Sequence, residues 1–243
     1  MSTNQDSPLA PPLPIADPEA SRRVPITRED LVVVSDPASQ QAEQFRALRN
    51  SIAALNPDGA PRTLVLTSAL RGEGKTTAAL NLAFALSERP GAKVLLIDAN
   101  LHAPAIEEHM GVARAQGLCE LLGGRLSPDQ AIRPTTLSGL SFIGAGAKPP
   151  KPSEVLASDR MRTLLRTLKQ RFNYVLLDTP EVTTTSDASL LAGMADGVVL
   201  VVRMGRTPKS YVDQACRTLE SMGANLLGTL LTGADLPNTA ARR

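Results

Sequence analysis

The chain has 243 residues, of which 42% are hydrophobic and only 2% aromatic, and its 26 basic residues nearly balance 24 acidic ones. The even charge and the lack of tryptophan argue against nucleic acid as the main partner, because nucleic-acid sites use basic surfaces and aromatic platforms. No apolar run approaches the about 20 residues of a membrane-spanning helix. We therefore expect a cytoplasmic protein that reaches the inner membrane only through a partner.

The N-terminal part of the chain predicts a disordered leader followed by a helix. Residues 1–28 contain six prolines, which do not fit inside helices or interior strands. Residues 35–55 then show apolar side chains at helical spacing. Asp36 is the expected N-cap of this helix and Pro37 its first residue, a position where the missing N–H is harmless.

The rest of the chain alternates between strand and helix patterns. Strands are expected at 63–69, 93–99, 140–146, 174–180, 197–203 and 225–231. Helices are expected at 75–88, 153–171, 187–195 and 208–222. Most strand segments are apolar without alternation, which is typical of a parallel sheet covered by helices on both faces. The sequence therefore predicts one α/β domain over residues 29–236, with a short tail at 237–243.

A glycine-rich turn joins the first of these strands to the first of these helices. The expected ligand-binding residues are Gly72, Glu73, Gly74, Lys75, Thr76 and Thr77. Glycines let backbone N–H groups converge on an anion, and the helix dipole favours negative charge there. Lys75 would reach the terminal phosphates of a nucleotide, and the Thr76 hydroxyl would bind Mg²⁺. Ala69 replaces the first glycine of the usual P-loop pattern, and a plain glycine turn with an incidental lysine is the alternative.

Two aspartates, Asp98 and Asp178, end predicted strands. Ligands of open parallel sheets bind at the carboxyl ends of strands, so both aspartates are expected near the glycine-rich turn. A carboxylate in that place can hold Mg²⁺ directly or through water. A single aspartate at a strand end is often a helix cap, but two beside a phosphate loop favour a metal site formed with Thr76.

Three segments together carry a resemblance to a known family. They are SALRGEGKTT at 68–77, VLLIDANLHAP at 94–104 and YVLLDTP at 174–180. They resemble the Walker A, Walker A′ and Walker B motifs of the bacterial tyrosine kinases (BY-kinases) of capsule and exopolysaccharide assembly, which are P-loop proteins related to the MinD and ParA ATPases. The resemblance covers residues from about 30 to 235. It implies ATP and Mg²⁺ as ligands, catalytic roles for Lys75, Asp98 and Asp178, and a separate transmembrane polysaccharide co-polymerase as partner.

The segment EQFRALR resembles the oligomerisation motif of the same family. Glu43, Arg46 and Arg49 are spaced by three residues, so their side chains lie on adjacent parts of one helix face. In the family this helix packs against a neighbouring subunit in a ring, which implies a homo-oligomer here. The alternative is an exposed ion pair within the helix, which contributes only about 0.3–0.5 kcal/mol.

The sequence departs from the family pattern at the residues closest to the chemistry. Asn100 and His102 stand where the family has an aspartate and an arginine, and the C-terminal tail contains no tyrosine. These departures leave two hypotheses open: an active tyrosine kinase, or a catalytically weak relative that regulates polysaccharide assembly through nucleotide binding. A MinD/ParA-type ATPase is a third, disfavoured because Leu70 replaces the lysine typical of that class. These departures affect tyrosine phosphorylation more directly than nucleotide binding.

Overall fold

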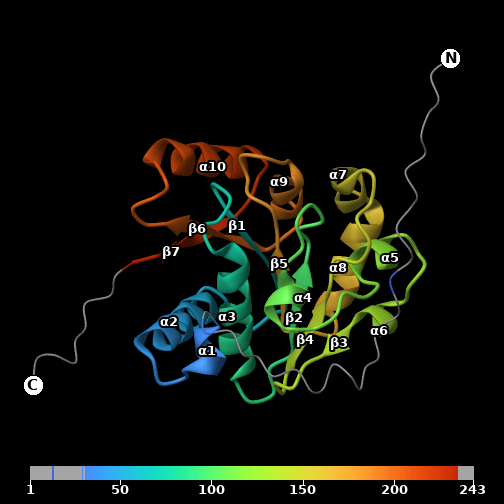
Figure 1. Ribbon diagram of the computed structural model, residues 1–243, viewed down its shortest axis with the longest axis horizontal. Coiled ribbons are helices and arrows are strands. Elements are labelled where there is room, and N and C mark those ends of the chain that lie inside the picture. Colours follow the sequence, from blue (N-terminus) through green and yellow to red (C-terminus); the bar gives the residue numbers. More distant parts are fainter. Residues whose placement is uncertain (1–12, 14–28, 30, 235–243) are drawn as a thin grey trace, which may run out of the picture.

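The computed structural model describes residues 13, 29 and 31–234, which form a single α/β unit (Figure 1). A mostly parallel sheet of seven strands is covered by helices on both faces, and this arrangement confirms the predicted fold class. The predicted tail at 237–243 and nearly all of the predicted leader at 1–28 lie outside the described residues. No helix in the described part of the chain combines the length and the apolar character needed to cross a bilayer.

The sheet has the order β3-β4-β2-β5-β1-β6-β7. Its strands are β1 (Arg62–Ser68), β2 (Val94–Asp98), β3 (Arg133–Pro134), β4 (Leu140–Ile143), β5 (Tyr174–Asp178), β6 (Gly197–Arg203) and β7 (Leu226–Thr232). All neighbours pair in parallel except β3 and β4. β4 is shorter than predicted because the carbonyls of Gly144 and Ala145 accept hydrogen bonds from the first N–H groups of a helix, Leu118–Leu122.

Ten helices occur in the described ranges. They are α1 (Val32–Ser35), α2 (Gln40–Ala54), α3 (Lys75–Ser87), α4 (Ile106–His109), α5 (Leu118–Leu122), α6 (Pro128–Ala131), α7 (Pro152–Leu156), α8 (Asp159–Lys169), α9 (Asp187–Ala192) and α10 (Lys209–Ser221). The short helices α1, α4, α5 and α6 have no counterpart in the sequence prediction, because segments of four or five residues are too short to display helical periodicity.

Two predicted helix boundaries are wrong, and a serine cap explains each. The helix predicted at 35–55 begins at Gln40, because the side chain of Ser39 accepts a hydrogen bond from the Ala42 N–H. Asp36 instead ends α1. The helix predicted at 153–171 is divided into α7 and α8, because Ser158 adopts an extended conformation and caps α8. Serine favours both caps and turns, so these interruptions follow ordinary capping chemistry.

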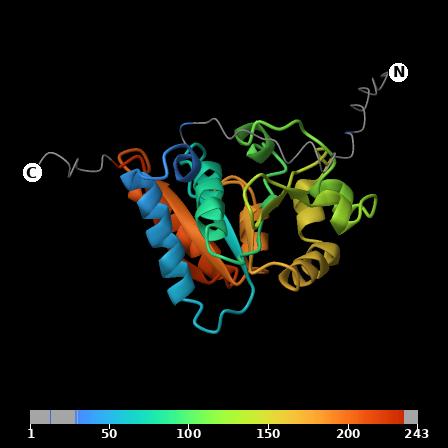
Figure 2. The ribbon, with the colours of Figure 1, turned by 90° about the horizontal axis from the view of Figure 1, so that it is seen from below.

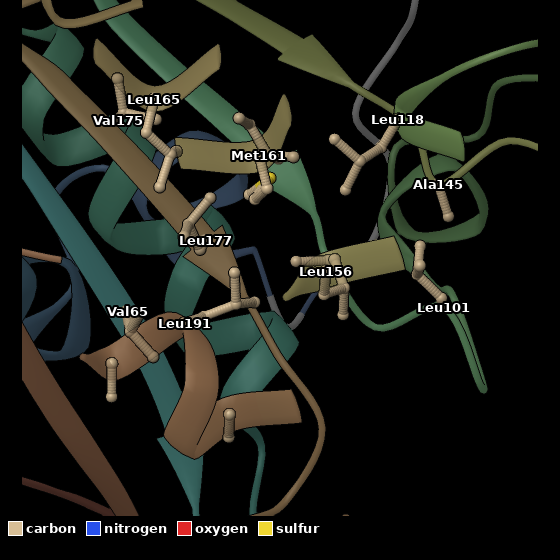
Figure 3. Close-up of a cluster of buried hydrophobic side chains, with 14 of the residues drawn as sticks. Val65, Leu101, Leu118, Ala145, Leu156, Met161, Leu165, Val175, Leu177 and Leu191 are labelled. Atoms are coloured by element: carbon tan, nitrogen blue, oxygen red, sulfur yellow. The ribbon is translucent and has the colours of Figure 1, made fainter. Parts of the chain in front are cut away.

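The side chains of alternating strand residues belong to two separate hydrophobic clusters, one on each face of the sheet. Val65, Val175 and Leu177 point to the face covered by α5 to α10, where Leu156 and Leu191 are among the side chains packed against them (Figure 3). The opposite face is covered by α1 to α4, with α2 lying beside α3 (Figure 2). Because α3 is packed on the sheet along most of its length, its N-terminus is held rigidly at the carboxyl end of β1.

Candidate functional site

The three predicted motif segments meet at one edge of the sheet. The strands β2, β5 and β1 are adjacent and parallel, so their carboxyl ends lie together. Asp98 of β2 is in register with Asp178 of β5. The glycine-rich loop leaves β1 beside them and enters α3 at Lys75. The structure thus brings the predicted phosphate loop and both predicted carboxylates into one site.

Two glycines shape the loop through their backbone conformations. Gly72 and Gly74 have φ angles of 82° and 87°, in the left-handed region that disfavours side chains. Gly74 is also the N-cap of α3, and no side chain caps that end of the helix. The first N–H groups of a helix have no partner within it, so this 13-residue helix offers donors and a positive dipole end to an anion.

Side chains from β6, β7 and the turn after β6 brace the loop. The buried carboxylate of Glu73 accepts a hydrogen bond from the Thr207 hydroxyl, and the Glu73 carbonyl accepts one from Thr232 Oγ1 at 2.7 Å. Arg203 donates to the Gly72 carbonyl at 3.2 Å. Glu73 therefore directs its charge into the protein and can meet a phosphate only through its backbone N–H. No local sequence pattern predicts these bracing residues, since they lie more than 120 positions from the loop.

Lys75 and Thr76, two of the predicted site residues, lie at the start of α3. Thr76 Oγ1 donates a hydrogen bond of 2.7 Å to Asp178 Oδ2. The second oxygen of Asp178, Oδ1, is buried and has no hydrogen-bond partner. Lys75 Nζ lies 3.5 Å from the carboxylate of Glu181, and both side chains are nearly buried. Glu181 was not singled out from the sequence.

The electrostatics of the two aspartates suit a divalent cation. Burial, together with the nearby charge of Asp178, raises the pKa of Asp98 to about 7. Burial also raises the pKa of Asp178 to about 6, although the Thr76 hydroxyl and the charge of Lys75 oppose the increase. A cation would favour the ionised forms of both groups. The unpartnered Asp178 Oδ1 beside a threonine hydroxyl is an oxygen donor set that fits Mg²⁺.

Asp98 also has a structural role. Its Oδ2 accepts hydrogen bonds from the N–H groups of Ala105 and Ile106, at 2.9 and 3.0 Å, and its Oδ1 accepts one from Asn100. Asp98 therefore caps the start of α4, which is the alternative that a strand-ending aspartate leaves open. This engagement of both oxygens makes Asp178 the better placed of the two to bind a metal ion directly.

The two residues that depart from the family pattern are built into the loop after β2. Asn100 Oδ1 accepts a hydrogen bond of 3.1 Å from the Ala103 N–H. His102 Nε2 lies 3.0 Å from Asp187 Oδ2, and Asp187 is fully buried at the start of α9. The Ser153 hydroxyl of α7 donates to the other oxygen of Asp187. His102 thus ties this loop to α7 and α9 through one carboxylate.

A large cavity extends from the phosphate loop toward α2. Its volume is about 830 Å³, within the range of about 300–1,000 Å³ common for ligand pockets. Gly74 and Thr77 line one end, Phe45 and Leu48 of α2 line one wall, and Thr232 lies at the end of β7. The cavity is therefore continuous with the N-terminus of α3 and has an apolar wall suited to a planar base.

The predicted oligomerisation motif makes contacts within the chain. Arg46 and Arg49 each form an ion pair of 2.8 Å with Glu88, which follows α3. Glu43 lies 3.5 Å from Arg46 and stays largely exposed. The two arginines therefore fasten α2 to α3, in addition to any role at a subunit interface.

Comparison with known proteins places this chain in a family. The ParA family model, described as an NUBPL iron-transfer P-loop NTPase, matches residues 60–231. Tyrosine-protein kinase YwqD of Bacillus subtilis (strain 168) is 33% identical over 209 residues, covering 86% of this chain and 88% of that protein.

Two solved structures extend the likeness to three dimensions. The chimerical protein CapA2B2 superposes with a TM-score of 0.79 at 33% identity, over 88% of this chain and 96% of that one. The kinase domain of Escherichia coli tyrosine kinase ETK gives a TM-score of 0.79 at 30% identity, over 85% and 82% of the two chains. The chain therefore belongs to the bacterial tyrosine kinases, a group of P-loop proteins related to the ParA and MinD ATPases.

Proposed function

We propose that this protein binds ATP with Mg²⁺ at the start of α3 and transfers the terminal phosphate to tyrosines of another chain. The observation that carries the proposal is the Thr76 hydroxyl on Asp178, with the second Asp178 oxygen unpartnered and Lys75 alongside. This arrangement presents a cation site and a phosphate-binding lysine at an uncapped helix N-terminus. Such a combination suits the β- and γ-phosphates of a nucleotide.

Each residue has a distinct task in this proposal. The N–H groups of 72–77 and the ammonium of Lys75 bind the phosphates, and Thr76 and Asp178 hold the metal ion, with Asp98 adding negative charge beside it. Mg²⁺ supplies charge neutralisation on the transferring phosphoryl group. The cavity lined by Phe45 and Leu48 receives the nucleoside.

The acceptor tyrosine belongs to a second protein. Tyr174 is only 8% exposed within β5, and Tyr211 on α10 is 42% exposed. We infer a transmembrane polysaccharide co-polymerase as the partner, so that the kinase works at the cytoplasmic side of the membrane and regulates exopolysaccharide or capsule assembly. Because Asn100 carries no charge, a weakly catalytic regulator that depends on nucleotide binding is the second candidate.

Separate measurement of ADP and phosphotyrosine tests the proposal. Purified protein is incubated with Mg²⁺ and labelled ATP, with and without the cytoplasmic segment of a candidate membrane partner that carries tyrosines. Phosphotyrosine on the partner segment supports the kinase. ATP binding without phosphotyrosine supports the regulator, and absence of nucleotide binding removes both.

Assembly through α2 is a further part of the proposal. Replacing Glu43, Arg46 and Arg49 with alanine is expected to shift any oligomer toward the monomer while the fold survives. Partly exposed ion pairs contribute only about 0.2–1 kcal/mol each, so losing those to Glu88 leaves the domain folded. Light scattering measures the mass, and thermal unfolding checks the fold.

Glu88→Gln is the matched control, because it removes the charge that pairs with Arg46 and Arg49 but leaves both arginines in place. If the arginines bind a neighbouring subunit, Glu88→Gln keeps the oligomer that the triple alanine variant loses. An equal mass for the wild type and the triple variant would contradict the interface.

A further inference from the structure

The contact between Lys75 and Glu181 adds a further carboxylate to the phosphate site, beside those of Asp98 and Asp178. Glu181 lies three residues after Asp178, in the loop that leaves β5, and its side chain is 12% exposed. Its Oε2 is 3.5 Å from Lys75 Nζ. Burial disfavours the charge of this carboxyl, but its own backbone N–H, Lys75 and Thr184 together hold the pKa of Glu181 below its ordinary range. Glu181 is therefore a carboxylate at neutral pH.

The backbone on both sides of Glu181 is fastened to the end of β1. The Thr67 hydroxyl donates to the Pro180 carbonyl at 2.7 Å, and the Val182 N–H donates to the Ser68 carbonyl at 2.9 Å. The Thr183 hydroxyl donates to the Ala69 carbonyl at 2.6 Å. Because β1 leads directly into the phosphate loop, Glu181 and the loop are parts of one rigid unit. The backbone that carries the Glu181 carboxylate is thus held close to the site.

A fixed negative charge beside the phosphate-binding lysine affects nucleotide binding, and the size of the effect depends on the charge of the nucleotide. A phosphate that contacts Lys75 must share the ammonium with Glu181 and lie near a like charge, which is unfavourable. Metal-free ATP carries the greatest negative charge and meets the largest penalty. Mg²⁺ on the phosphates reduces that charge, so the same carboxylate penalises the metal complex less.

We propose that Glu181 is a specificity-determining residue, which pairs with Lys75 and makes nucleotide binding conditional on Mg²⁺. The inference rests on the proposed ATP site. It assigns Glu181 no part in the chemical step, since Glu181 acts through the lysine and through its charge. We therefore expect the wild type to bind ATP much more tightly in the presence of Mg²⁺ than in the presence of a chelator.

Calorimetry with ATP, in excess Mg²⁺ and in EDTA, tests this role. For Glu181→Gln, which keeps the shape and removes the charge, we expect ATP affinity in EDTA to rise about tenfold. The change in Mg²⁺ should be about threefold or less, so the affinity ratio falls. Glu181→Asp keeps the charge and should retain most of the wild-type ratio. Glu154→Gln is the matched control, because Glu154 is exposed and paired with Lys151 away from the site.

The outcomes separate this inference from the proposed function. If the wild type binds ATP with Mg²⁺ but Glu181→Gln leaves the ratio unchanged, the role of Glu181 is refuted and the ATP site stands. If Glu181→Gln weakens binding in both conditions, the carboxylate supports the lysine instead of restricting it, and the inference is equally overturned. If the wild type binds no nucleotide under either condition, the proposed function itself fails. Thermal unfolding of each variant establishes that it is folded.

Discussion

Replacing Lys75 with methionine is expected to lower ATP affinity by about a hundredfold or more. Hydrogen bonds to charged groups contribute about 1.5–3 kcal/mol each, and about 1.4 kcal/mol corresponds to a tenfold change in affinity. Two phosphate contacts from one ammonium therefore account for an effect of this size. Methionine preserves most of the aliphatic side chain, so α3 keeps its packing. Calorimetry with ATP and Mg²⁺ provides the measurement.

The ion pair with Glu181 calls for a second variant. Lys75→Met alone leaves a nearly buried carboxylate without its partner, which is a cost separate from the lost phosphate contacts. The double variant Lys75→Met/Glu181→Gln removes that stranded charge. If the lysine binds phosphate, the double variant still binds ATP far more weakly than Glu181→Gln alone. Equal affinity in those two variants would show that Lys75 does not contact the nucleotide.

The second large effect is a gain of function at the loop after β2. The double variant Asn100→Asp/His102→Arg is expected to raise phosphorylation of a tyrosine-bearing partner segment by about tenfold or more, since a positioned acid or base contributes about 10²–10⁴-fold. Asn100 accepts a hydrogen bond from Ala103 through its side-chain oxygen, and an aspartate oxygen can accept the same bond. Arginine at 102 can contact Asp187 in place of the histidine and is charged throughout the working pH range.

The two single variants identify which change matters. Asn100→Asp restores the carboxylate alone, and His102→Arg alters only the link to Asp187. We expect most of the gain from Asn100→Asp, measured as phosphotyrosine formed per unit time at saturating ATP. Robust transfer by the wild type, or no increase in the double variant, would show that Asn100 does not limit the reaction.

The central parts of this site follow from local patterns in the sequence. The strand, glycine turn and helix around Lys75 are contiguous, so their geometry is encoded within about a dozen residues. Asp98 and Asp178 are distant in sequence, but each ends an apolar strand, and parallel strands share their carboxyl ends. Topology alone therefore brings the two aspartates together, as their register in the sheet shows.

Other features depend on contacts that no local pattern reports. Glu73 was expected to bind the ligand, yet its carboxylate turns inward to Thr207, 134 residues away. The partner of Arg46 and Arg49 is Glu88 on another element, which helical spacing within α2 cannot reveal. Glu181 follows a proline in an irregular loop, and its closeness to Lys75 depends on the hydrogen bonds between that loop and β1.

Because Tyr174 is buried, the number of phosphates that each kinase molecule can carry on tyrosine is limited. Tyr174 and Tyr211 are the two tyrosines of the chain, and of these Tyr211 is the accessible one. Any self-labelling on tyrosine of the folded protein is therefore limited to at most one phosphate per molecule, on α10. Any phosphotyrosine beyond that count resides on the acceptor. In a mixture of the two proteins, phosphotyrosine in excess of one per kinase molecule is therefore a lower bound on the number of partner hydroxyls converted.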